Sequence, residues 1–197
     1  MVAILLADGF EDMEVIITAD LLMRGKQEVL LVSTQETSDL VVKSARNIEV
    51  KAHCFLKDLK NSVLPDCVVI PGGMGGTKNL ACNNEVVDFI DTMNFENRLV
   101  AAICAAPVVV LSKTKVLNGK KFTCYPKMEE ELCLYGGEGV EKRVEGAQHY
   151  AETVIVDDNL ITSQGPGTTS AFALTILEKL AGKEIACSVA KGALFNY

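Results

Sequence analysis

Four short runs of mostly apolar residues, many of them β-branched, are spaced along the first 103 residues of the chain. They cover Val2–Leu6, Val29–Ser33, 66–70 and Leu99–Ile103. Strands that are apolar along their whole length, rather than at alternate positions, are typical of a parallel sheet that is buried on both faces. This feature predicts an α/β fold, a doubly wound and mostly parallel sheet with helices on both faces.

The segment between the first two runs has the spacing of an amphipathic helix over Asp12–Arg24. The apolar residues expected on its inner face are Val15, Ile16, Ala19, Leu22 and Met23. Thr168 or Thr169 is expected to cap a later helix that ends at Gly182. Two further pairs of short strands are expected, one over 40–44 with 48–51 and one over 152–156 with 160–162.

Length and charge limit the classes of protein to consider. A chain of 197 residues suits one domain spanning 1–197. The net charge is −7 and the basic residues are scattered, which argues against a nucleic-acid partner. The acidic run 129–131 is interpreted as a solvated helix face. The longest apolar stretch, 99–111, falls short of the roughly 20 residues that a membrane span needs, so no membrane partner is expected.

The seven cysteines are odd in number and show no C-x-x-C spacing. Neither a disulfide framework nor a metal site is therefore indicated, and no organic cofactor is expected. The N-terminal segment has no positively charged region before its short apolar run, unlike a signal peptide. We expect free thiols and a cytoplasmic location.

Ligand sites in doubly wound sheets lie outside the carboxyl ends of the strands, and this rule singles out three loops. The loops are 7–13, 71–76 and 104–107. In the third loop, the predicted strand runs directly into Cys104. The small residues Ala105 and Ala106 come next, and Pro107 fits the first turn of the helix expected after them. This pattern favours a nucleophile elbow, where the helix dipole is expected to lower the pKa of the thiol. The alternative is a small buried cysteine without chemistry.

The other two loops offer groups that suit a reactive thiol. Residues 72–76 contain four glycines, so backbone N–H groups there can approach a ligand closely and form an oxyanion hole. A tight turn is the simpler alternative. Glu14 lies among apolar residues of the first predicted helix, where burial is expected to raise the pKa of its carboxyl group and let it donate a hydrogen bond to a thiolate.

These loops, together with two later segments, resemble the ThiJ/PfpI superfamily, and most closely the subfamily of the parkinsonism-associated protein deglycase. The segments are 8–14 (DGFEDME), 69–76 (VIPGGMGG), 101–107 (AAICAAP), 163–168 (SQGPGT) and 177–184 (LEKLAGKE). They occur in the family's order along almost the whole chain. The resemblance implies a flavodoxin-like, class I glutamine amidotransferase-like sandwich.

The resemblance also implies roles for individual residues. Cys104 matches the family's oxidisable cysteine, and Glu14 matches the acid that hydrogen-bonds this cysteine and stabilises its sulfinate. Gly73 and Ala105 match backbone donors near the thiol. The positions expected to line the site are Gly72, Arg46, Arg24 and Tyr125. The two arginines are expected close to the site, partly across a homodimer interface.

Tyr125 departs from the family pattern, because many members have a histidine at this place. A Cys-His dyad is therefore not expected, and a tyrosine at the core or rim of the site is the simpler interpretation. Cys124, next to it, is a candidate for a regulatory disulfide with Cys104. The remaining cysteines are expected to be core or surface residues.

Three functions remain open at this level. The first is a cofactor-independent glyoxalase or deglycase that acts on methylglyoxal, a small reactive aldehyde, or on glycated substrates, with Cys104 as nucleophile and Glu14 relaying protons. The second is a non-catalytic, redox-responsive binding or chaperone-like protein that senses oxidation at Cys104. An intracellular protease or amidase is the least favoured, because a histidine partner is missing.

Overall fold

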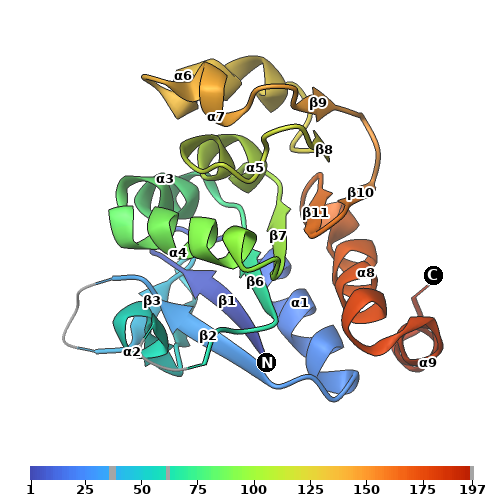
Figure 1. Ribbon diagram of the computed structural model, residues 1–197. Coiled ribbons are helices and arrows are strands. Elements are labelled where there is room, and N and C mark those ends of the chain that lie inside the picture. Colours follow the sequence, from blue (N-terminus) through green and yellow to red (C-terminus); the bar gives the residue numbers. More distant parts are fainter. Residues whose placement is uncertain (36–38, 61–62, 196–197) are drawn as a thin grey trace.

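A seven-stranded sheet forms the centre of the computed structural model, which describes residues 1–35, 39–60 and 63–195 (Figure 1). Its strands, in spatial order, are β10 (Val154–Asp157), β11 (Leu160–Ser163), β7 (Leu99–Ile103), β6 (Cys67–Ile70), β1 (Val2–Leu6), β2 (Val29–Ser33) and β5 (Cys54–Phe55). All neighbours run parallel except the β10–β11 pair. The four predicted buried strands are therefore confirmed, with the third beginning one residue later than expected.

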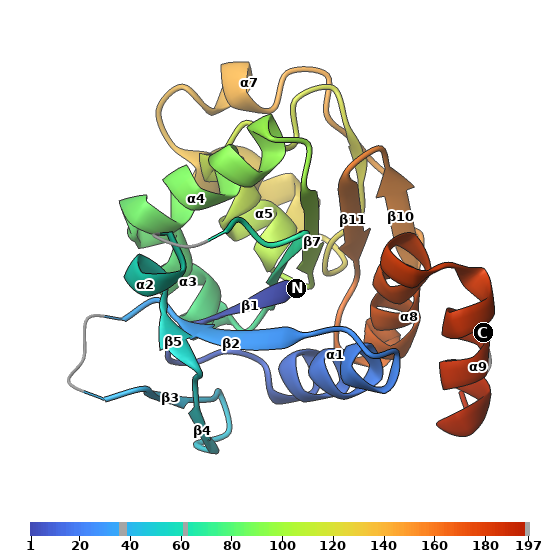
Figure 2. The same ribbon diagram turned by 60° about the horizontal axis from the view of Figure 1, so that its bottom comes forward.

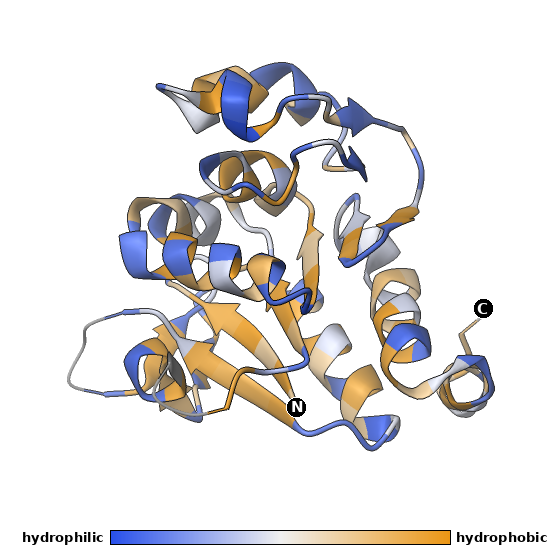
Figure 3. Cartoon of the chain, in the orientation of Figure 1, coloured by the Kyte–Doolittle hydropathy of each residue, from blue (hydrophilic) through white to orange (hydrophobic). Residues whose placement is uncertain are grey.

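Helices cover both faces of this sheet, as Figures 1 and 2 show. The first face carries α1 (Asp12–Arg24), α8 (Thr169–Ala181) and α9 (Lys183–Gly192). The second carries α2 (Leu56–Lys60), α3 (Met74–Cys82), α4 (Asn84–Phe95) and α5 (Ala106–Val109). Because successive side chains of a strand point to opposite faces, Ile4 packs in the first layer and Leu5 in the second. Figure 3 shows the resulting hydrophobic central strands.

The first helix begins and ends where the sequence predicts, but its buried face is rotated. Glu11 caps it by accepting a hydrogen bond from the backbone N–H of Glu14 at 2.9 Å. Ile16 and Met23 were expected inside, yet their exposed fractions are 50% and 45%. Leu21 is buried instead, because α8 packs beside α1 in a cluster that includes this leucine.

The cap predicted for the last long helix has a different role. Thr168 occupies the N-cap position of α8, but its hydroxyl makes no capping bond to the helix. Its Oγ1 accepts from the N–H of Gly165 at 3.0 Å and lies 2.7 Å from the hydroxyl of Ser163. The residue thus ties the start of the helix to the end of β11. Gly182 ends the helix with a positive φ of 90°, as expected of a glycine there.

Two short sheets and a group of small helices lie outside the main sheet. The predicted hairpin is confirmed as the antiparallel pair β3 (Val41–Lys43) and β4 (Glu49–Lys51). A parallel pair, β8 (Lys121–Phe122) and β9 (Gln148–His149), was not predicted. The helices between and around these strands are η1 (Leu111–Lys113), η2 (Met128–Glu131), α6 (Leu132–Gly136), α7 (Val140–Arg143) and η3 (Pro166–Thr168). In the described part of the chain, every helix is too short or too polar to span a membrane.

Candidate active site

The three predicted loops meet at the carboxyl ends of β1, β6 and β7. The strand order places β1 beside β6, where the chain changes the direction in which it adds strands, and this is where α/β sheets bind ligands. The backbone N–H of Glu11 donates to the carbonyl of Gly72 at 3.0 Å. The N–H of Gly72 in turn donates to Oε2 of Glu14 at 2.6 Å. The loop after β1 is thereby fastened to the loop after β6.

Cys104 occupies a sharp turn between β7 and α5. Its φ of 65° lies in the left-handed region, which residues other than glycine rarely adopt. Backbone bonds hold it there, because its N–H donates to the carbonyl of Ser163 at 3.0 Å and its carbonyl accepts from the N–H of Tyr125 at 2.8 Å. This is the geometry of a nucleophile elbow, which directs the side chain of the central residue away from the sheet.

Glu14 is fully buried next to this thiol. One oxygen accepts the hydrogen bond from Gly72, whereas Oε1 accepts none from the described backbone or hydroxyl groups. Burial raises the pKa of the Glu14 carboxyl from 4.5 to about 7, and the Gly72 N–H opposes this rise. The expectation of a buried acid that holds a proton near neutral pH is thus supported by the geometry.

The pKa of the Cys104 thiol differs from the expectation. The helix dipole was expected to lower it, but burial and the negative charge of Glu14 raise it well above the ordinary range. Hydrogen bonds from the amides of Ala105 and Gly73 act in the opposite direction. The helix that follows, α5, has only four residues, so its dipole is too small to outweigh desolvation.

The glycines of the second loop leave space that the site needs. A Cβ at Gly72 would lie 2.6 Å from the Cβ of Cys104 and 2.7 Å from Oε2 of Glu14. Gly73 has a φ of 88° and its added Cβ would collide with the backbone of the first loop. The loop therefore packs closely against the first loop, and any side chain at 72 would displace the thiol or the acid; the oxyanion hole stays a prediction.

A cavity of about 470 Å³ opens beside the thiol. Its lining residues are Glu11, Ala45, Arg46, Gly73, Met74, Gly75, Cys104, Ala105, Tyr125, Met128 and Pro166. Arg46 and Tyr125 are thus found at the rim, and Tyr125 is half-exposed. Arg24 is not, because it lies in the last turn of α1, ten residues or about 15 Å along the helix from Glu14, and pairs with Asp20 at 2.7 Å.

Comparison with known proteins shows which family this chain is similar to. The DJ-1/PfpI family model matches residues 1–179. The chain belongs to the DJ-1/PfpI family. Protein dj-1beta of Drosophila melanogaster is 38% identical over 198 residues, which cover 98% of this chain and 96% of that protein. The glutathione-independent glyoxalase DJR-1.2 of Caenorhabditis elegans is 34% identical over 181 residues, 92% of this chain and 88% of that protein.

Solved structures of the DJ-1 group have the same fold. The crystal structure of Drosophila melanogaster DJ-1beta matches with a TM-score of 0.88, covering 100% of this chain and 98% of that one at 38% identity. The oxidized Toxoplasma gondii DJ-1 matches with a TM-score of 0.86 and 30% identity, over 100% and 98% of the two chains. The flavodoxin-like sandwich expected from the resemblance is confirmed.

Two acids of the first loop have a role in this DJ-1/PfpI site that the sequence did not reveal. Oδ1 of Asp8 accepts from the N–H of Lys43 at 2.8 Å, and Oδ1 of Asp12 accepts from the hydroxyl of Ser44. Acids at the start of a helix also favour it through the helix dipole. These two acids in addition hold the β3–β4 hairpin, and with it Arg46, against the cavity.

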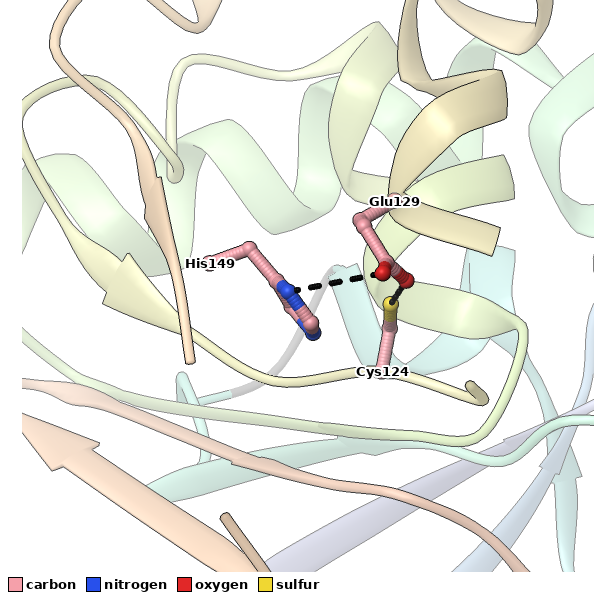
Figure 4. A group of neighbouring side chains, drawn as sticks. All are labelled: Cys124, Glu129 and His149. Carbon is pink, nitrogen blue, oxygen red and sulfur yellow. Dashed lines mark hydrogen bonds and ion pairs between the residues drawn. The ribbon is translucent and has the colours of Figure 1, made fainter. Parts of the chain in front are cut away.

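A second group of reactive side chains consists of Cys124, Glu129 and His149, shown in Figure 4. Sγ of the fully buried Cys124 lies 3.7 Å from Oε2 of Glu129, and Nδ1 of His149 lies 3.7 Å from Oε1 of the same carboxylate. The expectation of a solvated acidic run is wrong for Glu129, which turns inward, whereas Glu130 and Glu131 are exposed.

The seven cysteines, all within the described residues, are free thiols. The thiol of Cys124 faces Glu129 rather than the cavity, and burial together with that carboxylate raises its pKa to about 12. Cys104 faces Glu14 instead. The regulatory disulfide between the two stays a hypothesis that the present geometry does not favour. Cys67 is buried as expected.

A second cavity, of about 560 Å³, lies at the opposite edge of the sheet. Its walls include Leu99 and Asn159, which stand at or just before the amino ends of β7 and β11. Sites in α/β sheets form at the carboxyl ends, and no cysteine, serine or threonine is among the described residues that line this cavity. The cavity beside Cys104 is therefore the candidate active site.

Proposed function

We propose that this chain is a cofactor-independent glyoxalase or deglycase that converts methylglyoxal or its adducts, with Cys104 as nucleophile. The observation that carries the proposal is the Cys104 thiol at a strained turn, next to the buried carboxyl of Glu14 and open to a cavity. The similarity to a glutathione-independent glyoxalase supports the same activity.

The reaction needs no external oxidant. The sulfur of Cys104 adds to the aldehyde carbon of methylglyoxal and gives a hemithioacetal. Removal of the proton on that carbon, and its return at the neighbouring ketone, leaves a thioester of lactate. Water then cleaves the thioester, which releases lactate and restores the thiol. One carbon is oxidised while its neighbour is reduced, so the electrons balance with one water consumed.

Glu14 is suited to relay these protons. With its pKa raised to about 7, the carboxyl group is present in both protonation states near neutral pH. It accepts the thiol proton as sulfur attacks, so the high pKa of the thiol is overcome in the same step. The amides of Gly73 and Ala105 face the sulfur and are placed to stabilise an oxyanion beside it.

Methylglyoxal turnover tests the proposal directly. Purified protein is incubated with methylglyoxal, and the formation of lactate is followed beside Cys104→Ser and Cys133→Ser. Cys133 is an exposed thiol that does not line the cavity, so its variant controls for the loss of any cysteine. Lactate formation that requires Cys104 alone supports the proposal, whereas equal turnover by Cys104→Ser contradicts it.

A second candidate function is oxidation sensing through the same thiol. Two equivalents of peroxide convert the thiol to a sulfinic acid and release two waters. The amides of Ala105 and Gly73, and the free Oε1 of Glu14 when protonated, supply donors for the sulfinate oxygens. The test is to treat the protein with increasing amounts of peroxide and to locate the oxidised cysteines by peptide mass spectrometry. The function is rejected when Cys104 oxidises no earlier than the other six cysteines.

We also propose that the chain is a cytoplasmic homodimer. Unpaired cysteines are typical of a reducing compartment and support that location. Exposed apolar residues on α1, Met13 at 47% and Ile16 at 50%, support an interface on this helix. Light scattering of Ile16→Asp beside the unaltered chain tests it, because a charge at an apolar interface should favour the monomer.

A further inference from the structure

Cys124, Glu129 and His149 bring a sulfur, a carboxylate and an imidazole into one small space beside the active site. One ligand atom from each lies within 4.8 Å of the other two. Cys124 is fully buried, and the other two side chains expose 28% and 21% of their surface. The group is therefore enclosed on the sulfur side and reachable from solvent on the other.

The chain reaches this arrangement through contacts between distant segments. Pairing of β8 with β9 sets His149 opposite Phe122, two residues before Cys124, and the two rings meet edge to face at 5.5 Å. Lys127 has a φ of 71°, and this left-handed turn starts the 3-10 helix that returns Glu129 to the thiol. Ligands 20 residues apart leave no regular spacing in the sequence, which explains why no metal site was predicted.

The order of contacts argues against a second nucleophilic triad. Such a triad needs the imidazole next to the thiol and the carboxylate behind the imidazole. Here Glu129 stands between the other two, with contacts of 3.7 Å on each side (Figure 4). In addition, Nε2 of His149 is buried without a hydrogen-bond partner among the described residues. A sulfur, a carboxylate oxygen and a ring nitrogen thus lie close together, and loss of the proton that the thiol now donates to Glu129 would make all three electron-pair donors to a metal.

A cation is the ligand that such a centre recognises, and the donor set decides which one. Magnesium and calcium prefer oxygen ligands, whereas thiolate and imidazole favour zinc and similar borderline metals. Ligand atoms around tetrahedral zinc lie about 3.3–3.8 Å apart, given bonds of about 2.0–2.3 Å. Each contact of 3.7 Å is in this range, although the two contacts involve different oxygens of Glu129. With one ligand atom taken from each residue, all separations are within 4.8 Å, so the widest needs to shorten by up to about 1 Å.

We propose that Cys124, Glu129 and His149 form a binding site for a divalent zinc-type cation, distinct from the Cys104 centre. The cation replaces the thiol proton and is held by three protein ligands, with the fourth position open toward solvent. The backbone connects the two centres, because Sγ of Cys124 lies 3.4 Å from the carbonyl of Tyr125, whose own N–H binds the carbonyl of Cys104.

Cobalt(II) provides a spectroscopic probe, because a cobalt–thiolate bond gives a charge-transfer band in the near ultraviolet. The reduced protein is titrated with cobalt(II) and the metal is then displaced with zinc(II). The variants are Cys124→Ser, His149→Gln and Cys104→Ser, with Cys133→Ser as the matched surface control. His149 is partly exposed, so its variant tests the site even where a change at the buried Cys124 impairs folding.

The proposal predicts one cobalt(II) per chain, with a band that Cys133→Ser and Cys104→Ser keep and Cys124→Ser loses. His149→Gln should weaken binding about tenfold or more. Zinc(II) should raise the unfolding temperature of the unaltered protein but not of Cys124→Ser. A band that disappears with Cys104 rather than Cys124, or the absence of any band, overturns the proposal. The outcome is independent of methylglyoxal turnover.

Discussion

Cys104 and Cys124 lie close together in the fold, each beside a carboxylate, but they have opposite surroundings. Cys104 faces the amides of Ala105 and Gly73 and opens on a cavity. Cys124 is closed off from that cavity and faces the acceptor atoms of Glu129 and His149. Donor groups favour an anion such as an oxyanion or a sulfinate, whereas acceptor groups favour a cation. The pKa of a thiol alone, raised in both cases, does not distinguish the two chemistries.

The largest expected difference between the two thiols is in turnover. Cys104→Ser should lower kcat/KM for methylglyoxal by at least about 1,000-fold, because the nucleophile is lost. Cys124→Ser should cause a far smaller loss, since its thiol does not line the cavity. Steady-state assays of both variants check this. Equal losses would mean that the two regions form one catalytic unit.

The next largest effect is expected for the carboxylate of Glu14. Glu14→Gln should lower kcat/KM by about 100-fold, the usual contribution of a positioned acid or base. In the unaltered protein, kcat/KM should rise with pH and level off above about 7, where Glu14 is ionised. The Glu14→Gln variant should lack this rise of kcat/KM with pH. A pH profile of kcat/KM for each protein provides the measurement, and an unchanged profile would assign the proton relay to another group.

The stability of the fold should also depend on the charge of Glu14. Its pKa is higher in the folded chain, about 7 against an ordinary 4.5, so the folded state keeps a proton that the unfolded state releases. The free energy of unfolding should therefore fall by up to about 3 kcal/mol as pH rises from about 4.5 through 7. Urea titrations should show this fall reduced in Glu14→Gln and kept in Glu152→Gln, which changes an exposed acid.

The smallest expected effect tests how closely Gly72 packs against Cys104 and Glu14. Gly72→Ala should lower the free energy of unfolding by about 1–3 kcal/mol, because the new methyl group overlaps Cys104 and Glu14. Gly167→Ala is the matched control, since no atom lies within 4 Å of its added Cβ. Chemical denaturation of both proteins is sufficient. Equal stability of the two variants would show that the thiol and the acid shift aside easily.

Local patterns predicted the fold and the Cys104 centre because each signal lies within a few residues. The strand Val2–Leu6 is apolar throughout, and Glu14 interrupts the apolar face of a helix of 13 residues. A carboxylate at such a position is costly unless it has a task, which made its burial predictable. The bounds of α1 were predicted to the residue, since acidic residues mark its start and Gly25 its end.

Properties that depend on neighbours far along the chain were missed. Ile16 and Met23 belong to an apolar pattern, but only the placement of α8 decides which side of α1 is covered. The raised pKa of Cys104 depends on how deeply the turn is buried, which the sequence does not state. His149 joins Cys124 through strands of two residues each, too short for a periodic signal.

The left-handed backbone conformation at Cys104 makes the stability of the fold and the reactivity of this position conflicting demands. A residue with a side chain costs about 1–2 kcal/mol in this conformation, and glycine does not. Cys104→Gly is therefore expected to unfold at a higher temperature than the unaltered protein while losing its nucleophile. Under selection for heat resistance alone, position 104 is a place where this chain would give up reactivity in exchange for a more robust scaffold.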